Sequence, residues 1–136
     1  MTTKALFITG ASSGIGAATA RLAIAQGWQV GLFARSKDKL DALAGELVTD
    51  LDNLKTAMAT FVGKTGGLNA VFANAGMGLS AFGTEAGNPE EWEQMIGVNI
   101  LGVLWTVMAA MPHLKKCAGH LLLTGSAAGR VHIPGS

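Results

Sequence analysis

A string of small residues near the N-terminus could bind a phosphate group: Thr9-Gly10-Ala11-Ser12-Ser13-Gly14-Ile15-Gly16. Glycine permits a tight turn and lets backbone N–H groups approach an anion, and the hydroxyls of Ser12 and Ser13 add donors. The string joins an apolar run, Lys4–Thr9, to a helical pattern, Gly14–Gln26, which is the context that a nucleotide-binding loop requires. The predicted contacts to a nucleotide pyrophosphate are therefore Gly10, Ser12, Ser13, Gly14, Ile15 and Gly16. The alternative is that the glycines only turn the chain.

The residues after the second apolar run, Gln29–Ala34, bear on which dinucleotide would bind. A site for NAD usually has an Asp or Glu about 20 residues beyond the glycine string, where it binds the ribose 2′-hydroxyl. Here the sequence reads Ala34-Arg35-Ser36-Lys37, with no acid before Asp38. A guanidinium can hold a 2′-phosphate through two hydrogen bonds, whereas a carboxylate would repel it. Arg35 therefore favours NADP over NAD, unless it is an ordinary solvated residue.

Apolar runs of strand length alternate with helical patterns along the chain. The predicted strands are Lys4–Thr9, Gln29–Ala34, Leu68–Ala73 and Gly119–Thr124. The predicted helices are Gly14–Gln26, Asp38–Val48, Leu51–Lys64 and a helix or helix pair from Pro89 to about Lys116, with loops at Met77–Asn88 and Gly125–Ser136. This alternation predicts an α/β fold, a doubly wound parallel sheet covered on both faces, in one domain spanning residues 1–136. The second and third helices follow each other without an intervening strand, so the predicted sheet is incomplete.

The composition excludes several classes of protein. Of the 136 residues 49% are hydrophobic and only 14% are charged, which excludes a disordered chain. The single cysteine excludes a disulfide scaffold, and the net charge of +1 gives no electrostatic reason to expect nucleic acid. The low charge suggests that much surface is buried, in a two-sided sheet or against a partner. The short N-terminal apolar run and the lone cysteine predict a cytoplasmic protein.

One uncharged segment, Gln94–Pro112, is about as long as a membrane span. Asn99, Gly102 and Thr106 interrupt it, and no basic cluster orients it. These features favour a helix buried between the sheet and a partner subunit over a membrane-spanning helix.

Four motifs in order resemble those of the short-chain dehydrogenase/reductase family. The glycine string resembles the cofactor loop of that family, and Ala73-Asn74-Ala75-Gly76 resembles its Asn-Asn-Ala-Gly motif, with Ala73 in place of the first Asn. Val98-Asn99 resembles its helix-borne Asn, and Gly125-Ser126-Ala127-Ala128-Gly129 resembles its serine segment. The resemblance covers essentially the whole chain. It implies a Rossmann-type fold, cofactor contacts from Asn74, Ala75 and Gly76, and a homo-oligomer formed through the helix around Asn99.

The resemblance also implies hydride transfer between a nicotinamide and a carbonyl or alcohol carbon of a small molecule. Ser126 would hydrogen-bond the substrate oxygen, and Asn99 would hold a water molecule in a proton relay. A Tyr-x-x-x-Lys pair would supply the general acid/base; the chain has no tyrosine, and the pair would fall just beyond Ser136. Relatives have a third strand and an Asp that contacts adenine where this chain has a deletion near Leu47, and Asp50 is a weak substitute.

No metal site is predicted, because His113, His120 and His132 lack the spacing of metal ligands.

Three functions remain open. The chain could be part of an NADP-dependent oxidoreductase, a catalytically inactive NADP-binding module, or an interaction protein whose Met95–Met111 helix mediates assembly.

Overall fold

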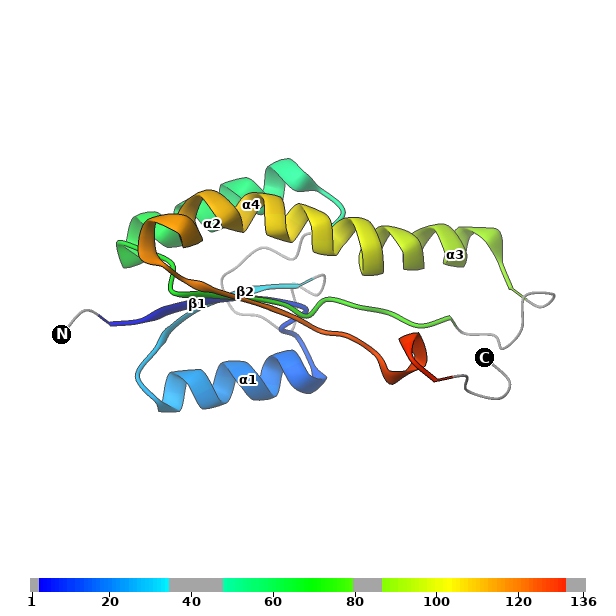
Figure 1. Ribbon diagram of the computed structural model, residues 1–136, viewed down its shortest axis with the longest axis horizontal. Helices are drawn as coiled ribbons and strands as arrows, with labels where there is room; N and C mark the ends of the chain where they lie inside the picture. Colours follow the sequence, from blue (N-terminus) through cyan, green and yellow to red (C-terminus); the bar gives the residue numbers. More distant parts are fainter. Residues whose placement is uncertain (1–2, 35–47, 80–86, 132–136) are drawn as a thin grey trace.

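The structure is a computed structural model that describes residues 3–34, 48–79 and 87–131. Its strands are β1 (Ala5–Thr9), β2 (Gln29–Phe33), β3 (Ala70–Ala73) and β4 (His120–Leu123). Its helices are α1 (Gly14–Ala25), α2 (Leu51–Thr65), α3 (Pro89–Ile96) and α4 (Gly102–Cys117), with a π-helical turn at Gly97–Leu101 and a 3₁₀ turn at Ala127–Gly129. The strands lie in the order β2-β1-β3-β4 and every neighbouring pair is parallel (Figure 1). The predicted α/β fold class is confirmed.

Strand β1 occupies the middle of the sheet because both of its faces are apolar. Leu6 and Ile8 belong to a buried cluster with alanines of α1, whereas Ala5 and Phe7 belong to the cluster formed with α2 and α4. Successive side chains of a strand point to opposite faces, so an uninterrupted apolar run can be buried only between two layers. The ring of Phe7 lies 5.7 Å from that of Phe61 on α2, centroid to centroid.

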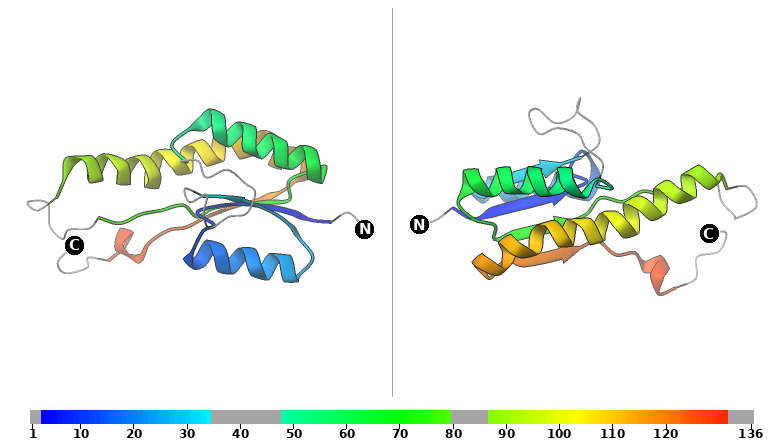
Figure 2. Two further views of the ribbon diagram at one scale, coloured as in Figure 1. Left: turned by 180° about the vertical axis from the view of Figure 1, so that it is seen from behind. Right: turned by 90° about the horizontal axis from the view of Figure 1, so that it is seen from above.

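Helices α2 and α4 cover one face of the sheet, and α1 covers the other (Figures 1 and 2). Helix α1 is followed by Gly27, which has a φ of 78° and turns the chain into β2. Asp50 caps the N-terminus of helix α2, because its Oδ1 accepts a hydrogen bond of 3.0 Å from the backbone N–H of Asn53. The same carboxylate accepts a second bond, of 2.8 Å, from Asn53 Nδ2. Both carboxylate oxygens of Asp50 therefore accept hydrogen bonds from Asn53, in the first turn of α2.

Helices α3 and α4 and the π-helical turn between them form one continuous rod, Pro89–Cys117 (Figure 1). Asn88 caps the rod through a 3.0 Å bond from the N–H of Glu90 to its Oδ1, and Pro89 takes the first helical position, as predicted. The rod is 29 residues long and apolar enough to cross a membrane by length and composition, and 28% of its most apolar window is buried. One side of its α4 part packs on β3 and β4, whereas α3 extends beyond the strands and has no buried residue (Figure 1).

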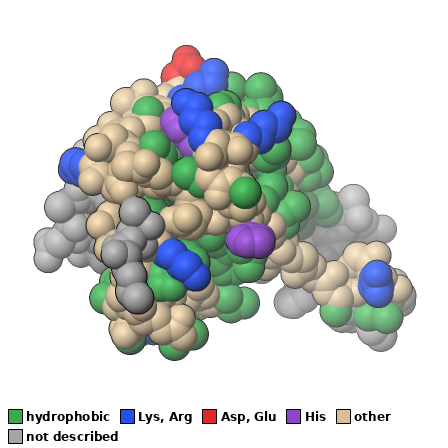
Figure 3. All heavy atoms as spheres, turned by 60° about the vertical axis from the view of Figure 1, so that its left-hand side comes forward, with side chains coloured by type: hydrophobic (Ala, Val, Ile, Leu, Met, Phe, Trp, Pro, Cys, Tyr) green, Lys and Arg blue, Asp and Glu red, His purple; other side chains and the backbone are tan. Residues whose placement is uncertain are grey.

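The face of the sheet that carries α1 is covered less completely than the sequence suggests. On this face Leu122 of β4 is 49% exposed; its neighbour Leu123, which is 54% exposed, points to the opposite face. Helix α1 lies against β1 and β2, and within the described residues no other helix reaches the β4 end of that face. In Figure 3 apolar side chains are exposed beside the Lys, Arg and His side chains. The expected two-sided cover therefore holds for β1 and fails for β4.

Two further expectations concern segments at the limits of the described residues. Most of the predicted helix Asp38–Val48 lies outside them, and its last residue, Val48, lies in a turn before α2. The predicted loop Gly125–Ser136 contains the 3₁₀ turn at Ala127–Gly129, because the hydroxyl of Ser126 accepts a hydrogen bond from the N–H of Ala128 and starts it.

Candidate functional site

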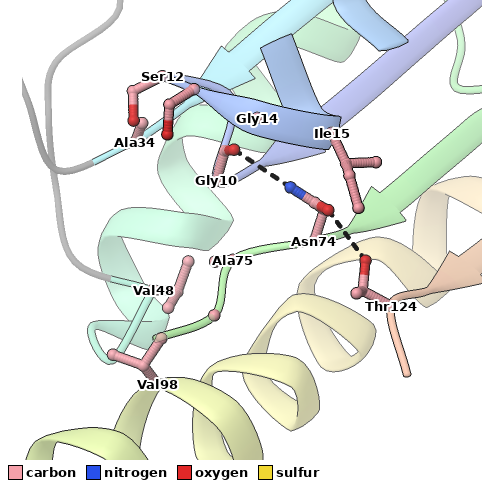
Figure 4. Close-up of a pocket in the computed structure, with 12 residues that line it drawn as sticks. Gly10, Ser12, Gly14, Ile15, Ala34, Val48, Asn74, Ala75, Val98 and Thr124 are labelled. Carbon is pink, nitrogen blue, oxygen red and sulfur yellow. Dashed lines mark hydrogen bonds between the residues drawn. The ribbon is translucent and has the colours of Figure 1, made fainter. Parts of the chain in front are cut away.

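A cavity of about 460 Å³ lies where the chain leaves the carboxyl ends of the four strands. It is lined by Gly10, Ser12, Ser13, Gly14, Ile15, Ala34, Val48, Asn74, Ala75, Gly76, Val98 and Thr124 (Figure 4). Eight of these are residues that the sequence predicts to contact a cofactor. The structure therefore brings the glycine string and the Asn74-Ala75-Gly76 segment, which are far apart in the sequence, into one site.

The glycine loop can approach the segment after β3 because two of its residues have no side chain. A Cβ atom on Gly10, which has a φ of 68°, would lie 2.6 Å from Ala75 Cα. A Cβ atom on Gly16, which lies behind the cavity, would overlap the carbonyl oxygen of Gly10. Gly14 differs from both: its φ is 55°, but a Cβ atom there would meet nothing within 4 Å. It needs glycine for its backbone conformation and stands beside open space.

The first turn of α1 presents backbone donors at this cavity. Its N-cap, Ser13, makes no side-chain hydrogen bond to the helix, and the first turn contains no acidic residue. The N–H groups at a helix N-terminus have no partner within the helix, and the helix dipole places partial positive charge there. Ser12 is half-buried and Ser13 is exposed, so both hydroxyls lie at the surface of the loop. The arrangement can bind an anion.

The side chain of Asn74 joins the ends of three strands. Its Nδ2 donates a hydrogen bond of 3.2 Å to the carbonyl oxygen of Gly10, and its Oδ1 accepts one of 2.9 Å from the hydroxyl of Thr124 (Figure 4). Its backbone N–H and that of Ala75 donate to Oγ1 of Thr9, at 3.1 and 3.3 Å. These bonds fix the floor of the cavity between the glycine loop and the end of β4.

Opposite the glycine loop the cavity has an apolar wall, made by Val48 and Val98 with Ala75 beside them (Figure 4). Val48 is 5% exposed and belongs to the same core cluster as Val98. Ala34, at the end of β2, lines the cavity next to the segment that contains Arg35. None of the lining residues that the structure describes carries a charge.

Asn99 lies in the π-helical turn and outside the cavity lining. Its Oδ1 accepts a hydrogen bond of 2.9 Å from the N–H of Met77, and its Nδ2 donates one of 2.8 Å to the carbonyl oxygen of Met77. The amide thus holds the loop that leaves Gly76. Ser126 is exposed two residues beyond Thr124, and its hydroxyl accepts a bond from Ala128, at 3.2 Å.

Arg35 lies outside the described residues, so its side chain is not placed. Four lining residues were not singled out from the sequence: Ala34, Val48, Val98 and Thr124. Ala34 and Thr124 directly follow strands, and the rule that sites form at the carboxyl ends of parallel strands could have identified them. Within the described ranges no three His, Cys, Asp or Glu side chains cluster as metal ligands would.

The sequence matches the family described as short chain dehydrogenase over residues 4–136. It is 35% identical to an uncharacterized oxidoreductase of Staphylococcus saprophyticus, across 98% of this chain and 58% of that protein. It is 39% identical to an uncharacterized oxidoreductase of Staphylococcus aureus strain N315, across 95% of this chain and 61% of that protein.

The fold is also similar to that of an alcohol dehydrogenase from the archaeon Thermococcus sibiricus complexed with 5-hydroxy-NADP. The TM-score is 0.89 and the identity is 32%, over 98% of this chain and 62% of that one. The chain thus spans about three fifths of the length of these proteins. The family match, the parallel sheet and the glycine loop at its carboxyl edge agree, and this chain belongs to the short-chain dehydrogenase family.

Proposed function

We propose that the protein binds a nicotinamide dinucleotide, NADP in preference to NAD, in the cavity at the carboxyl edge of the sheet. We further propose that it is an oxidoreductase that transfers a hydride between the nicotinamide and a carbonyl or alcohol carbon of a small molecule. One observation carries the proposal: the glycine loop, the uncapped N-terminus of α1 and the Asn74-Ala75-Gly76 segment line one cavity, and its described lining residues carry no charge.

The residues present fit a dinucleotide. A pyrophosphate needs backbone donors and no nearby carboxylate, and among the residues placed in the structure the loop Gly10–Gly16 meets both conditions. Gly14 has no side chain, and the position that a Cβ atom would occupy there has no other atom within 4 Å. The apolar wall of Val48 and Val98 suits the face of a flat base. The hydroxyls of Ser12, Ser13 and Thr124 add polar groups along the same cavity.

The preference for NADP rests on Arg35 and on the lack of an acid at the end of β2. Arg35 directly follows Ala34 in the sequence, and Ala34 lines the cavity. A 2′-phosphate carries the charge that a guanidinium binds best. The alcohol dehydrogenase of Thermococcus sibiricus, which shares this fold, was complexed with an NADP derivative.

When bound, the nicotinamide would accept or donate the hydride, and the protein would bind and orient both partners. By family likeness Ser126 is the proposed donor to the substrate oxygen. Asn99, which lies in the π-helical turn, is proposed to hold a water molecule in a proton relay. Its side-chain amide also binds the backbone of Met77. The chain contains no tyrosine, so a dinucleotide-binding module without turnover is the second candidate function.

We also propose that the protein is a homo-oligomer through the rod that contains Asn99. Its exposed side carries Ile96, Ile100, Leu104 and Met108, four large apolar residues at intervals of four. Such spacing forms one stripe along a helix, and an exposed apolar stripe of this length is typical of an interface. Insertion of the rod into a membrane is the alternative that its length and composition allow.

Isothermal titration of the purified protein with NADP, NADPH, NAD and NADH tests the binding proposal. Binding of NADP at lower concentration than NAD is expected, with 1:1 stoichiometry per chain. Absence of binding by all four would contradict it. Oxidation of NADPH in the presence of a panel of small aldehydes and ketones then separates the two functions: turnover supports the oxidoreductase, and binding without turnover supports the module.

A further inference from the structure

Gly102, the first residue of α4, is glycine although its backbone does not require it. Its φ and ψ are −60° and −36°, an ordinary helical conformation in which alanine is more favourable than glycine by about 1 kcal/mol. The residue is buried. Local helix propensity therefore gives no reason for a glycine here, and the reason lies in what packs against it.

The neighbour of Gly102 is Val48. A Cβ atom on Gly102 would lie 2.6 Å from Cγ2 of Val48 and 3.2 Å from its Cβ. Both distances are shorter than carbon atoms in van der Waals contact allow. The branched side chain of valine is stiff at χ1, so it has little freedom to turn away. The absence of a side chain at Gly102 is what lets Val48 sit against α4.

The backbone of Gly102 is held from both directions. Its N–H donates to the carbonyl oxygen of Gly97, and its own carbonyl oxygen accepts a 2.7 Å hydrogen bond from the buried hydroxyl of Thr106. Because the helix is fixed, added bulk at this position would displace Val48. That residue lines the cavity, so its displacement would move the apolar wall of the site.

We propose that Gly102 is a positioning residue: by admitting Val48 against α4, it sets the apolar wall that receives the adenine end of the dinucleotide. The inference rests on the proposed function. The adenine end is assigned to this wall because Ala34 and Val48 line the same cavity, and the 2′-phosphate proposed to meet Arg35 belongs to the adenosine half.

Gly97 provides a matched control in the same π-helical turn. It is also helical, with φ of −55° and ψ of −49°, but a Cβ atom there would lie 3.4 Å from Cγ2 of Thr49, an ordinary contact. Gly97→Ala should therefore be tolerated, whereas Gly102→Ala should not. Val48→Ala removes Cγ2, the atom that would lie 2.6 Å from the new Cβ of Gly102→Ala, and leaves only the 3.2 Å approach to Cβ of residue 48, so the double variant should regain most of the space.

The experiment measures binding of adenosine 2′,5′-bisphosphate and of reduced nicotinamide mononucleotide to the wild type and the four variants. Gly102→Ala should bind the adenosine probe about tenfold more weakly than the wild type, in the range found for residues in contact. The double variant should bind the adenosine probe with an affinity within about twofold of that of the single variant Val48→Ala. Gly97→Ala should match the wild type, and the nicotinamide probe should bind all five proteins alike.

The outcomes separate this inference from the proposed function. If the wild type binds neither probe, the proposed function fails and the inference fails with it. If the wild type binds the adenosine probe and Gly102→Ala binds it equally well, only the inference is overturned. Equal weakening for both probes would make Gly102 a general structural residue and overturn it too. If Gly102→Ala does not fold, the double variant with Val48→Ala decides. A double variant that folds and binds the adenosine probe supports the inference, and a double variant that does not fold overturns it.

Discussion

The amide side chain of Asn99 forms two hydrogen bonds with the backbone of Met77, one to each of its peptide groups, at 2.9 and 2.8 Å. The two residues are 22 positions apart, and the pairing ties the π-helical turn to the loop that follows β3. An asparagine side chain can pair with the N–H and the carbonyl oxygen of one residue because its amide offers one acceptor and one donor side by side. The pairing gives Asn99 a structural task independent of catalysis.

Replacing Asn99 should therefore loosen the loop after β3 even when no cofactor is present. Asn99→Asp keeps the shape and the acceptor but turns the donor into a second acceptor facing the carbonyl oxygen of Met77. We expect it to lower the free energy of unfolding by about 1–2 kcal/mol and to speed hydrogen exchange at the N–H of Met77, the amide that donates to Asn99. Gln94→Ala, at an exposed position of α3, is the control. Unchanged exchange in Asn99→Asp would show that the pairing does not order the loop.

The sequence predicts this fold well wherever the signal is local. Pro89 marks the start of a predicted helix because its fixed φ suits the first turn, and the structure confirms that start, with Asn88 as the cap. The alternation of Leu6 and Ile8 with Ala5 and Phe7 is not visible in a uniformly apolar run, yet burial on both faces follows from the run itself.

Exposure of β4 was not predictable, because burial of Leu122 and Leu123 depends on elements far away in the chain. The residues of the site divide in the same way, into those with a local sequence signal and those placed by distant parts of the chain. Its glycine loop is a local pattern, whereas Val48 joins the cavity only because Gly102 leaves room for it. A contact between positions 54 residues apart has no periodicity by which to find it.

Thr9 provides a second test of how the site is held. It is 1% exposed, and its hydroxyl oxygen accepts from the N–H groups of Asn74 and Ala75. Thr9→Val preserves the shape but leaves both donors without an acceptor, which should cost about 1–3 kcal/mol of unfolding free energy. Hydrogen exchange at those two amides should accelerate in the same variant.

Thr9→Ser is the matched control, because it keeps the hydroxyl and removes one methyl group. It should lose only about 1 kcal/mol and leave the exchange of both amides slow. If Thr9→Val and Thr9→Ser behave alike in exchange, packing rather than hydrogen bonding holds the segment after β3.

Arg35→Ala tests the choice of cofactor. Loss of a charged hydrogen bond to the 2′-phosphate should weaken NADP binding by about 10- to 100-fold, while NAD, which has no such phosphate, should bind nearly as before. Titration calorimetry with both dinucleotides gives the two affinities, and Arg21→Ala on the exposed side of α1 is the control. Equal losses for NADP and NAD would remove Arg35 as the selecting residue.

Gly14→Val tests the phosphate-binding role of the glycine loop. Gly14 has a φ of 55°, which costs an L-residue about 1–2 kcal/mol, and the new side chain would stand in the open space that the loop presents to the cavity. Binding of NADP and NAD should be lost together, and the strain should lower the melting temperature by about 3–10 °C. Gly63→Ala, on a helical glycine of α2 with equally open surroundings, should leave binding intact. Full affinity in Gly14→Val would place the phosphates elsewhere.

The apolar stripe on the rod predicts the mode of assembly. Ile100 and Leu104 are 55% and 51% exposed, and a charge at either position would be buried without a partner in an interface. We expect the wild type to sediment as an oligomer and the double variant Ile100→Lys, Leu104→Lys to sediment as a monomer at the same concentration. Ile24→Lys, at a comparably exposed position on α1, should leave the assembly unchanged. A monomeric wild type that co-sediments with phosphatidylcholine vesicles would replace the interface with a membrane contact.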